Sequence, residues 1–277
     1  MKLGTLLRIS DINDTDAKFK TLKDNGFEAC QIVYKPEVYT KEAAKVIRDA
    51  AEKYGIDVSA QFCGYYDEDT VWDNYYGFLT AGLYVEAYRK GRVDYIKKAA
   101  EFAKEAGITD IVIHAGYIPN NPFAPEYASL LTAIDMLCRH LKTLEMNLLL
   151  ETGGESAVTM LRLIKDSGHD NLFINMDPAN MLMYGYANPI DFIYTVGQYV
   201  RNVHGKDGVP PTDPRVLGAE TPVGEGRVDF YGMFRDLKAK GYDRYIIIEH
   251  EISGEKQTED VLKAKKYFEK MLVDLGY

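Results

Sequence analysis

Residues 96–114 read IKKAAEFAKEAGITDIVIH, and the order of features in this stretch is the one that recurs along the chain. The first part predicts a helix, because its apolar residues share one face, at Ile96, Ala99, Ala100 and Ala103. Gly107 predicts the end of that helix, since glycine adopts the left-handed cap conformation without a Cβ penalty. Residues 108–114 are rich in isoleucine and valine and predict a strand that ends at His114.

The same order of helix, glycine and β-rich run repeats from one end of the chain to the other. The glycines at these junctions are Gly26, Gly55, Gly107, Gly168, Gly197 and Gly241. The runs are continuously apolar, as in Leu148-Leu149-Leu150, which is typical of parallel strands covered on both faces. We expect eight strands, near residues 2–8, 28–33, 56–62, 108–114, 146–151, 171–177, 199–204 and 244–250.

This alternation predicts the α/β class, and eight strands favour one closed (β/α)8 barrel, a TIM barrel, as a single domain over residues 1–277. No glycine-rich fingerprint follows the first predicted strand, which argues against an open dinucleotide-binding sheet. The length is ordinary for one such barrel and can bury a large core without disulfides.

The composition excludes several classes of partner. The net charge of −9 disfavours nucleic acid and anionic membranes, since both call for basic patches. No apolar run approaches the roughly 20 residues of a membrane span, and the first residues lack the features of a signal peptide. Three cysteines without close spacing fit a reducing compartment, so we expect a cytoplasmic protein. The sequence allows a homo-oligomer but does not determine the oligomeric state.

Each of the last four predicted strands ends on a residue that can bind a metal: Glu151, Asp177, His204 and Glu249. In a barrel, the carboxyl ends of the strands converge on one rim. Three carboxylates left unpaired there would repel one another, and a divalent cation removes that repulsion. Three oxygens and one imidazole suit manganese, magnesium, cobalt, iron or zinc.

Two predicted connections at this rim are unusually long, residues 64–90 and 205–228. The first is rich in aromatic residues, namely Tyr65, Tyr66, Trp72, Tyr75, Tyr76, Phe78 and Tyr84. Long loops in compact domains often act as lids or binding loops. We therefore expect residues 64–90 to cover the site and Trp72 or a neighbouring tyrosine to contact substrate, although aromatic residues also pack cores.

Several segments together resemble the xylose isomerase-like barrel superfamily, in its sugar phosphate isomerase/epimerase branch. They are Leu150-Glu151-Thr152-Gly153, Asp177-Pro178-Ala179-Asn180, His204-Gly205-Lys206-Asp207, residues 224–230 (GEGRVDF) and Ile248-Glu249-His250-Glu251. The resemblance covers essentially the whole chain. It is specific to the superfamily, whose members include ketose 3-epimerases, hydroxypyruvate isomerases, inosose dehydratases, dehydroshikimate dehydratases and endonuclease IV.

The resemblance to the ketose 3-epimerases implies that the four matched residues bind manganese or cobalt, with manganese expected first. It also implies that Glu151 and Glu249 are the catalytic acid and base on opposite faces of the substrate. Removal of a proton next to a carbonyl builds an enediolate, whose charge a bound metal stabilises. Asn180 stands where these epimerases and endonuclease IV place a histidine, so a three-metal cluster is not expected.

Further candidates for substrate binding are His114, Asn180, Lys206, Trp72 and Glu155. Each has a structural alternative: His114 can satisfy backbone groups, Lys206 can be a solvated surface lysine, and Glu155 can cap the next helix, which we favour slightly. His250 is expected outside the barrel and Glu251 toward the site, because side chains alternate along a strand. Residues 224–226 are expected to form a turn, since Glu225 would repel a phosphate.

Three functions remain open. The leading hypothesis is a metal-dependent isomerase or epimerase acting on a free sugar or a polyol-derived ketose. A dehydratase of the inosose or dehydroshikimate type would begin with the same proton abstraction and then expel water. A non-catalytic sugar-binding barrel is disfavoured, because all four ligand positions are occupied by residues that bind metals.

Overall fold

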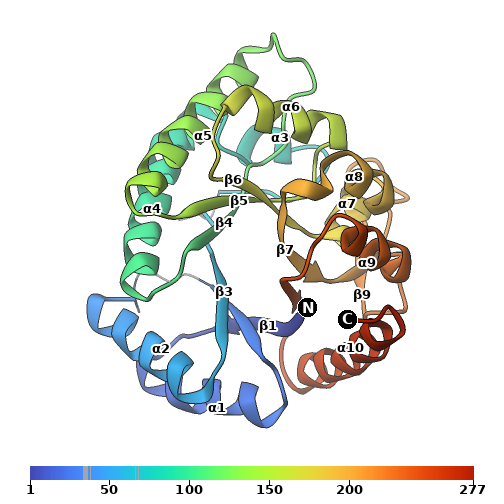
Figure 1. Ribbon diagram of the computed structural model, residues 1–277. Helices are drawn as coiled ribbons and strands as arrows, with labels where there is room; N and C mark the ends of the chain where they lie inside the picture. Colours follow the sequence, from blue (N-terminus) through green and yellow to red (C-terminus); the bar gives the residue numbers. More distant parts are fainter. Residues whose placement is uncertain (34–36, 38, 66, 68) are drawn as a thin grey trace.

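The predicted strands pair in parallel around a closed barrel in the order β1-β10-β7-β6-β5-β4-β3-β2, which confirms the expected fold (Figure 1). The computed structural model describes residues 1–33, 37, 39–65, 67 and 69–277. The barrel strands are β1 (Lys2–Arg8), β2 (Ala29–Val33), β3 (Asp57–Phe62), β4 (Asp110–His114), β5 (Asn147–Glu151), β6 (Leu172–Met176), β7 (Val200–Gly205) and β10 (Tyr245–Ile248).

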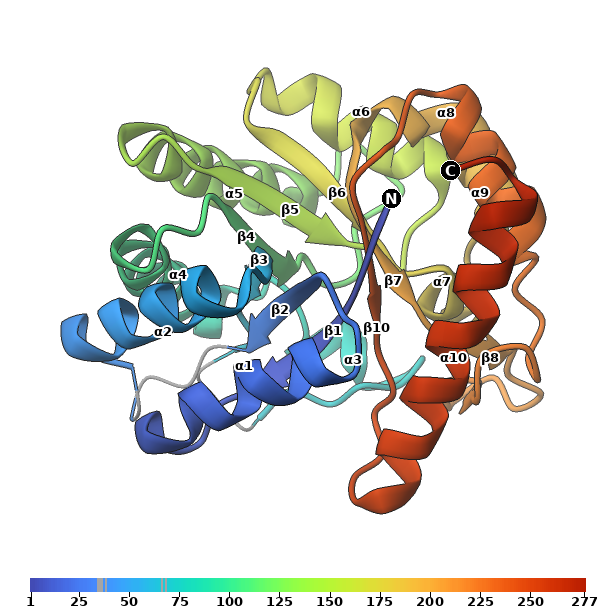
Figure 2. The ribbon, with the colours of Figure 1, turned by 60° about the horizontal axis from the view of Figure 1, so that its bottom comes forward.

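Helices surround this barrel (Figures 1 and 2). Buried apolar residues of most of them form one hydrophobic core with residues of the strands. They are α1 (Thr15–Asp24), α2 (Lys41–Tyr54), α3 (Gly77–Thr80), α4 (Glu86–Glu105), α5 (Pro125–Thr143), α6 (Ala157–Ser167), α7 (Pro178–Tyr184), α8 (Pro189–Val196), α9 (Phe230–Ala239) and α10 (Glu255–Asp274). Short 3₁₀ turns precede α1 and β7, at η1 (Ile12–Asp14) and η2 (Gly197–Tyr199). No described helix is long and apolar enough to cross a membrane.

A helix ends at or just before each of the six predicted glycines, and five of the six have the expected left-handed conformation. Gly55 and Gly168 are left-handed caps, with φ of 64° and 65°. Gly26, Gly107 and Gly241 also have positive φ. At Gly197 the predicted helix end is confirmed, since Gly197 is the C-cap of α8. The expected left-handed conformation is wrong there: its φ of −54° is right-handed, because the chain continues directly into the 3₁₀ turn η2. A Cβ on Gly197 would lie 3.0 Å from Ile193 Cγ2, so close packing explains this glycine.

The two long connections have structure of their own. Residues 205–228 contain an antiparallel hairpin of β8 (Asp207–Val209) and β9 (Ala219–Thr221). Residues 64–90 contain the short helix α3 and the first turn of α4. Tyr66, one of the aromatic residues named above, lies outside the described residues.

The opposite end of the barrel is closed by an ion-pair network. Asp110 at the start of β4 is buried and accepts hydrogen bonds from Arg201 Nε at 3.0 and 2.9 Å. Arg244 lies 3.4 Å from the same carboxylate. Two guanidinium groups thus surround one buried carboxylate at the amino-terminal end of the strands, opposite the carboxyl rim.

Candidate metal centre and its cavity

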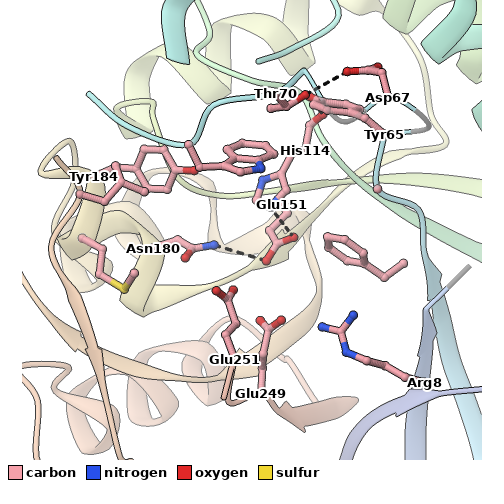
Figure 3. A pocket seen from close by; sticks show the side chains of 15 residues that line it. Arg8, Tyr65, Asp67, Thr70, His114, Glu151, Asn180, Tyr184, Glu249 and Glu251 are labelled. Carbon is pink, nitrogen blue, oxygen red and sulfur yellow. Dashed lines mark hydrogen bonds and ion pairs between the residues drawn. The ribbon is translucent and has the colours of Figure 1, made fainter. Parts of the chain in front are cut away.

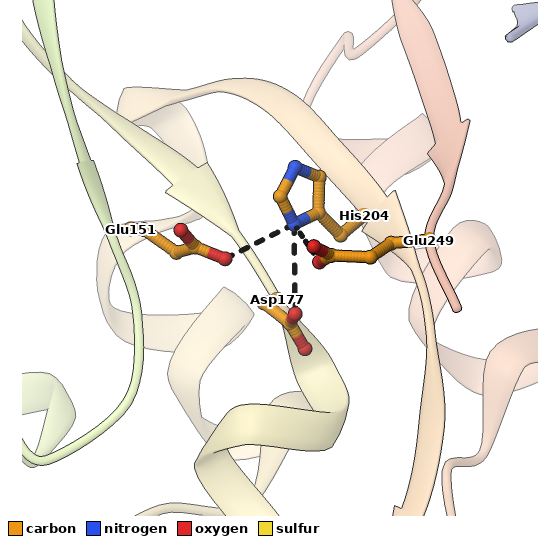
Figure 4. A group of neighbouring side chains, drawn as sticks. All are labelled: Glu151, Asp177, His204 and Glu249. Carbon is orange, nitrogen blue, oxygen red and sulfur yellow. Dashed lines mark ion pairs between the residues drawn. The ribbon is translucent and has the colours of Figure 1, made fainter. Parts of the chain in front are cut away.

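The four predicted ligands converge at the carboxyl rim (Figure 4). Glu151 ends β5, Asp177 follows β6, His204 lies near the end of β7, and Glu249 follows β10. Each offers one ligand atom, and these atoms all lie within 4.8 Å of one another. His204 Nδ1 is the common point, at 2.9 Å from Glu249 Oε2, 3.1 Å from Glu151 Oε1 and 3.5 Å from Asp177 Oδ2.

The polar atoms at this point lack ordinary partners. Apart from ion-pair contacts within the site, four buried atoms have no hydrogen-bond partner among the described residues: Glu151 Oε2, Asp177 Oδ2, His204 Nδ1 and Glu249 Oε2. Buried polar atoms in native proteins are normally satisfied, and each exception calls for a partner. Carboxylate oxygens and an imidazole nitrogen are hard or borderline donors that suit a divalent cation. The residues present therefore fit a divalent metal site.

Local structure orients Asp177 toward this centre. Its Oδ1 caps α7 by accepting the backbone N–H of Asn180 at 2.8 Å, which leaves Oδ2 facing the other ligands. Its backbone is held by Thr152, whose hydroxyl accepts from Asp177 N at 2.8 Å and donates to Asp177 O at 2.9 Å. The residue that follows Glu151 thus ties the ends of two neighbouring strands together.

Charged groups of the centre strongly perturb one another. Burial alone would lower the pKa of His204, but attraction by Glu249 and Glu151 outweighs it and holds that pKa well above its usual range. Burial would raise the pKa of Glu249, yet Lys206 and His204 hold it well below the usual carboxyl range. Glu249 therefore stays ionised and can bind a cation at neutral pH.

Lys206 is not a solvated surface lysine, since its side chain is only 1% exposed. Its Nζ lies 3.7 Å from both Asp177 Oδ2 and Glu249 Oε2 and donates to Glu251 Oε1 at 2.5 Å. Burial would lower the pKa of Lys206, but the surrounding carboxylates, Glu249 first, raise it well above its usual range. The structural alternative for Lys206 is therefore wrong, and its predicted contact with substrate remains open.

A cavity of about 370 Å³ opens above the centre (Figure 3). Glu151 and Glu249 form part of its floor, and the predicted residues His114, Trp72 and Asn180 also line it. His114 Nε2 lies 3.3 Å from Glu151 Oε2. The Trp72 ring lies 4.8 Å from the His114 ring. The structure thus brings these three residues to the ligand cluster, while their contacts with substrate stay predictions.

Glu155 does not cap the next helix, so the slightly favoured prediction for this residue is wrong. Ser156 is the cap of α6, since its Oγ accepts from Thr159 N at 3.3 Å. The buried Glu155 carboxyl instead accepts the backbone N–H of Gly153 at 3.1 Å. Burial is the main cause that raises its pKa to about 8, so it is largely a neutral acid at neutral pH. Its contact with substrate stays a prediction.

Two further expectations near the site are confirmed. His250 points away from the cavity and pairs with Glu220 and Asp260, whereas Glu251 lines the cavity. Residues 224–228 form a turn around the Asp207 carboxylate, which accepts the backbone N–H groups of Gly224, Gly226 and Val228 at 2.9 to 3.1 Å. The chain's own carboxylate thus occupies the donors that a phosphate would need.

The sequence reasoning missed two arginines. Arg8 ends β1 and lines the cavity, and a charged residue directly after Leu6-Leu7 at a strand end was the available signal. Arg92 of α4 is fully buried and holds residues 64–85, the aromatic loop that precedes this helix. It donates to both oxygens of Asp67 at 2.8 and 2.9 Å and to Thr70 Oγ1 at 2.9 Å, and it stacks 4.0 Å from the Tyr65 ring.

Fold and site together define a class of protein: a (β/α)8 barrel with a buried centre of three carboxylates and one imidazole at its carboxyl rim. Residues 19–271 match the profile of the xylose isomerase-like TIM barrel family, so the chain belongs to that family.

The similarity to known proteins covers almost the whole length of this chain. A crystal structure of a xylose isomerase domain protein from Planctomyces limnophilus is 29% identical, covers 99% of this chain and 98% of that one, and has a TM-score of 0.90. An uncharacterized protein from Methanocaldococcus jannaschii is 24% identical over 287 residues, which are 93% of this chain and 92% of that protein. A D-tagatose 3-epimerase-like protein is 21% identical, with a TM-score of 0.75 and coverage of 99% and 98%, and shares the fold.

Trp72 gives a direct test of the aromatic loop. It is the only tryptophan of the chain, its exposed fraction is 41%, and it lines the cavity. We expect a bound sugar to reduce quenching of its fluorescence by acrylamide and to shift its emission. An inert polyol at the same concentration is the control. If a sugar that the protein converts leaves both signals unchanged, the loop does not cover the substrate.

The raised pKa of Glu155 predicts a pH dependence of stability. The native protein retains a proton that the unfolded chain, with a carboxyl pKa of 4.5, releases. Stability should therefore fall as the pH rises from about 4.5 to about 8, by about 1.4 kcal/mol per pH unit. Glu155→Gln should remove this component, as measured by urea unfolding at pH 6 and pH 8 with saturating metal. Parallel pH profiles of Glu155→Gln, the wild type and the exposed control Glu259→Gln would refute the assignment.

Proposed function

We propose that this protein is a divalent-metal-dependent sugar isomerase or epimerase that moves a proton next to a carbonyl. The observation that carries the proposal is that Glu151 and Glu249 reach the same metal-binding point from different strands and also line the cavity. Two carboxylates beside one substrate allow one to remove a proton and the other to return it. A divalent ion, manganese first, would supply the charge that stabilises the enediolate.

The neighbours of the two glutamates support these roles. His114 Nε2 lies 3.3 Å from Glu151 Oε2, and Lys206 Nζ lies 3.7 Å from Glu249 Oε2. Each carboxylate thus has its own nitrogen neighbour, besides the metal point that they share. A group that gains and loses a proton during turnover benefits from such a partner, because the partner stabilises its ionised form. We infer that His114 and Lys206 also hold the substrate oxygens.

The charge of the cavity supports an uncharged sugar as the substrate. Five carboxylates face the centre and its loop: Glu151, Asp177, Glu249, Glu251 and Asp67. The two charges of the metal, with Lys206, Arg92 and Arg8, match them among the described residues. Glu155 adds no charge while it is protonated. A phosphate or carboxylate on the substrate would add a charge that this set does not balance.

The test is solvent exchange on a panel of free ketoses, inososes and keto acids in deuterium oxide, with the metal-loaded protein. We expect deuterium at the carbon next to the carbonyl together with an epimerised or isomerised sugar. Deuterium exchange followed by loss of water would instead identify a dehydratase built on the same first step. Tight binding without any exchange would identify a sugar-binding barrel and overturn the proposal.

A further inference from the structure

His204 has two ring nitrogens that face different neighbours. Nδ1 faces the carboxylates of the metal centre, and Nε2 lies 2.9 Å from Gln31 Oε1 on β2. Both side chains are fully buried. A nitrogen that binds a metal offers its lone pair, so the other nitrogen of a neutral imidazole must carry the proton. With Nδ1 bound to metal, Nε2–H therefore needs an acceptor inside the barrel.

The orientation of the Gln31 amide is set by its other neighbours. Asn202 Nδ2 donates to Asn175 Oδ1 at 2.6 Å, which makes that oxygen the acceptor end of Asn175. Gln31 Nε2 donates to the same oxygen at 3.5 Å, so the carbonyl end of Gln31 is turned toward His204. Asn175 Nδ2 lies 3.2 Å from His204 Nε2, but an amide nitrogen cannot accept a proton. Gln31 Oε1 is the acceptor that this arrangement leaves.

We propose that Gln31 is a positioning residue of the metal centre, which accepts the Nε2 proton of His204 and holds the ring with Nδ1 toward the metal. This inference rests on the metal site of the proposed function and not on the reaction. β2 and β6 lie opposite each other in the strand order, so the link from Gln31 to Asn175 crosses the barrel. A residue of the first quarter of the chain thereby orients a ligand in the third quarter.

The first test is metal affinity, measured by calorimetric titration of Mn²⁺ into chelator-stripped protein. Gln31→Leu removes the acceptor at similar volume and should weaken binding about 10- to 100-fold, the usual effect of losing such a partner. Gln31→Glu restores an acceptor and should bind within about threefold of the wild type. The matched control is Gln61→Leu on β3, because Gln61 is equally buried and its amide has no hydrogen-bond partner among the described residues.

The second test needs no substitution at Gln31. Nitrogen-15 spectra of histidine-labelled protein loaded with diamagnetic Zn²⁺ report which ring nitrogen of His204 carries the proton, with His204→Gln used for assignment. We expect a protonated Nε2 and a metal-bound Nδ1. The proposal is overturned by a protonated Nδ1, by wild-type affinity in Gln31→Leu, or by an equal loss in Gln61→Leu. If the wild type itself binds no divalent metal, the metal site of the proposed function fails instead.

Discussion

Glu151→Gln and Glu249→Gln are each expected to lower turnover by about 10²- to 10⁴-fold, the usual contribution of general acid/base groups. Glutamine keeps the shape of the side chain and one oxygen that can bind a metal, but it removes the basic carboxylate. Both positions line the cavity and face His204 Nδ1, so each variant must be compared with the wild type at measured metal occupancy. Metal content, solvent-deuterium exchange and product formation are the three readouts.

A two-base mechanism further predicts that these variants differ in proton exchange and in net epimerisation. One of them can still exchange the proton on the face that its surviving carboxylate serves, while net epimerisation stops. Asp177→Asn is the contrasting ligand variant, whose activity should follow metal occupancy alone. Normal turnover of a glutamine variant at full occupancy would show that this glutamate is only a ligand. The proton would then move through another group, for which Lys206 and His114 are the next candidates.

Removal of the metal should abolish activity and lower the thermal stability. Without the ion, three buried carboxylates depend on the neighbouring nitrogens of His204, Lys206 and His114, and four of the polar atoms lose their partner. A ligand present at 1,000 times its dissociation constant stabilises a native protein by about 4 kcal/mol, and chelation withdraws that stabilisation.

The measurement is a thermal unfolding scan and a turnover assay on chelated protein, before and after addition of manganese, cobalt or magnesium. His204→Gln serves as the control, since chelation should change its stability far less than that of the wild type. Full activity in protein that elemental analysis finds free of metal would contradict the proposed centre.

The barrel and the ligand set could be predicted from the sequence because both follow from local patterns. Apolar runs give strand positions, and parallel strands bring residues at their carboxyl ends together, so Glu151, Asp177, His204 and Glu249 could be grouped without coordinates. The conformation of Gly197 was mispredicted because the same residue type serves as a left-handed cap and as a place of close packing. The sequence pattern around it does not distinguish the two uses.

The remaining features depend on contacts between distant segments. Arg92 looks like one more charged residue of an amphipathic helix, and only its contacts with Asp67, Thr70 and Tyr65 show that it holds the aromatic loop. Glu155 lies next to a good capping residue, Ser156, and its burial decides its role. Such facts need the packing of the folded chain and cannot be derived from residue type or spacing.

The four metal ligands all come from β5 onward, whereas the aromatic loop comes from the connection between β3 and α4. The ligand set thus lies in the second half of the chain, and the loop that we expect to cover the substrate lies in the first half. Gene duplication followed by divergence can change the loop, with Arg92 as its anchor, without rebuilding the ligands. A protein engineer has the same freedom: libraries confined to residues 64–85 vary the expected substrate contacts, while the four ligand positions stay unchanged.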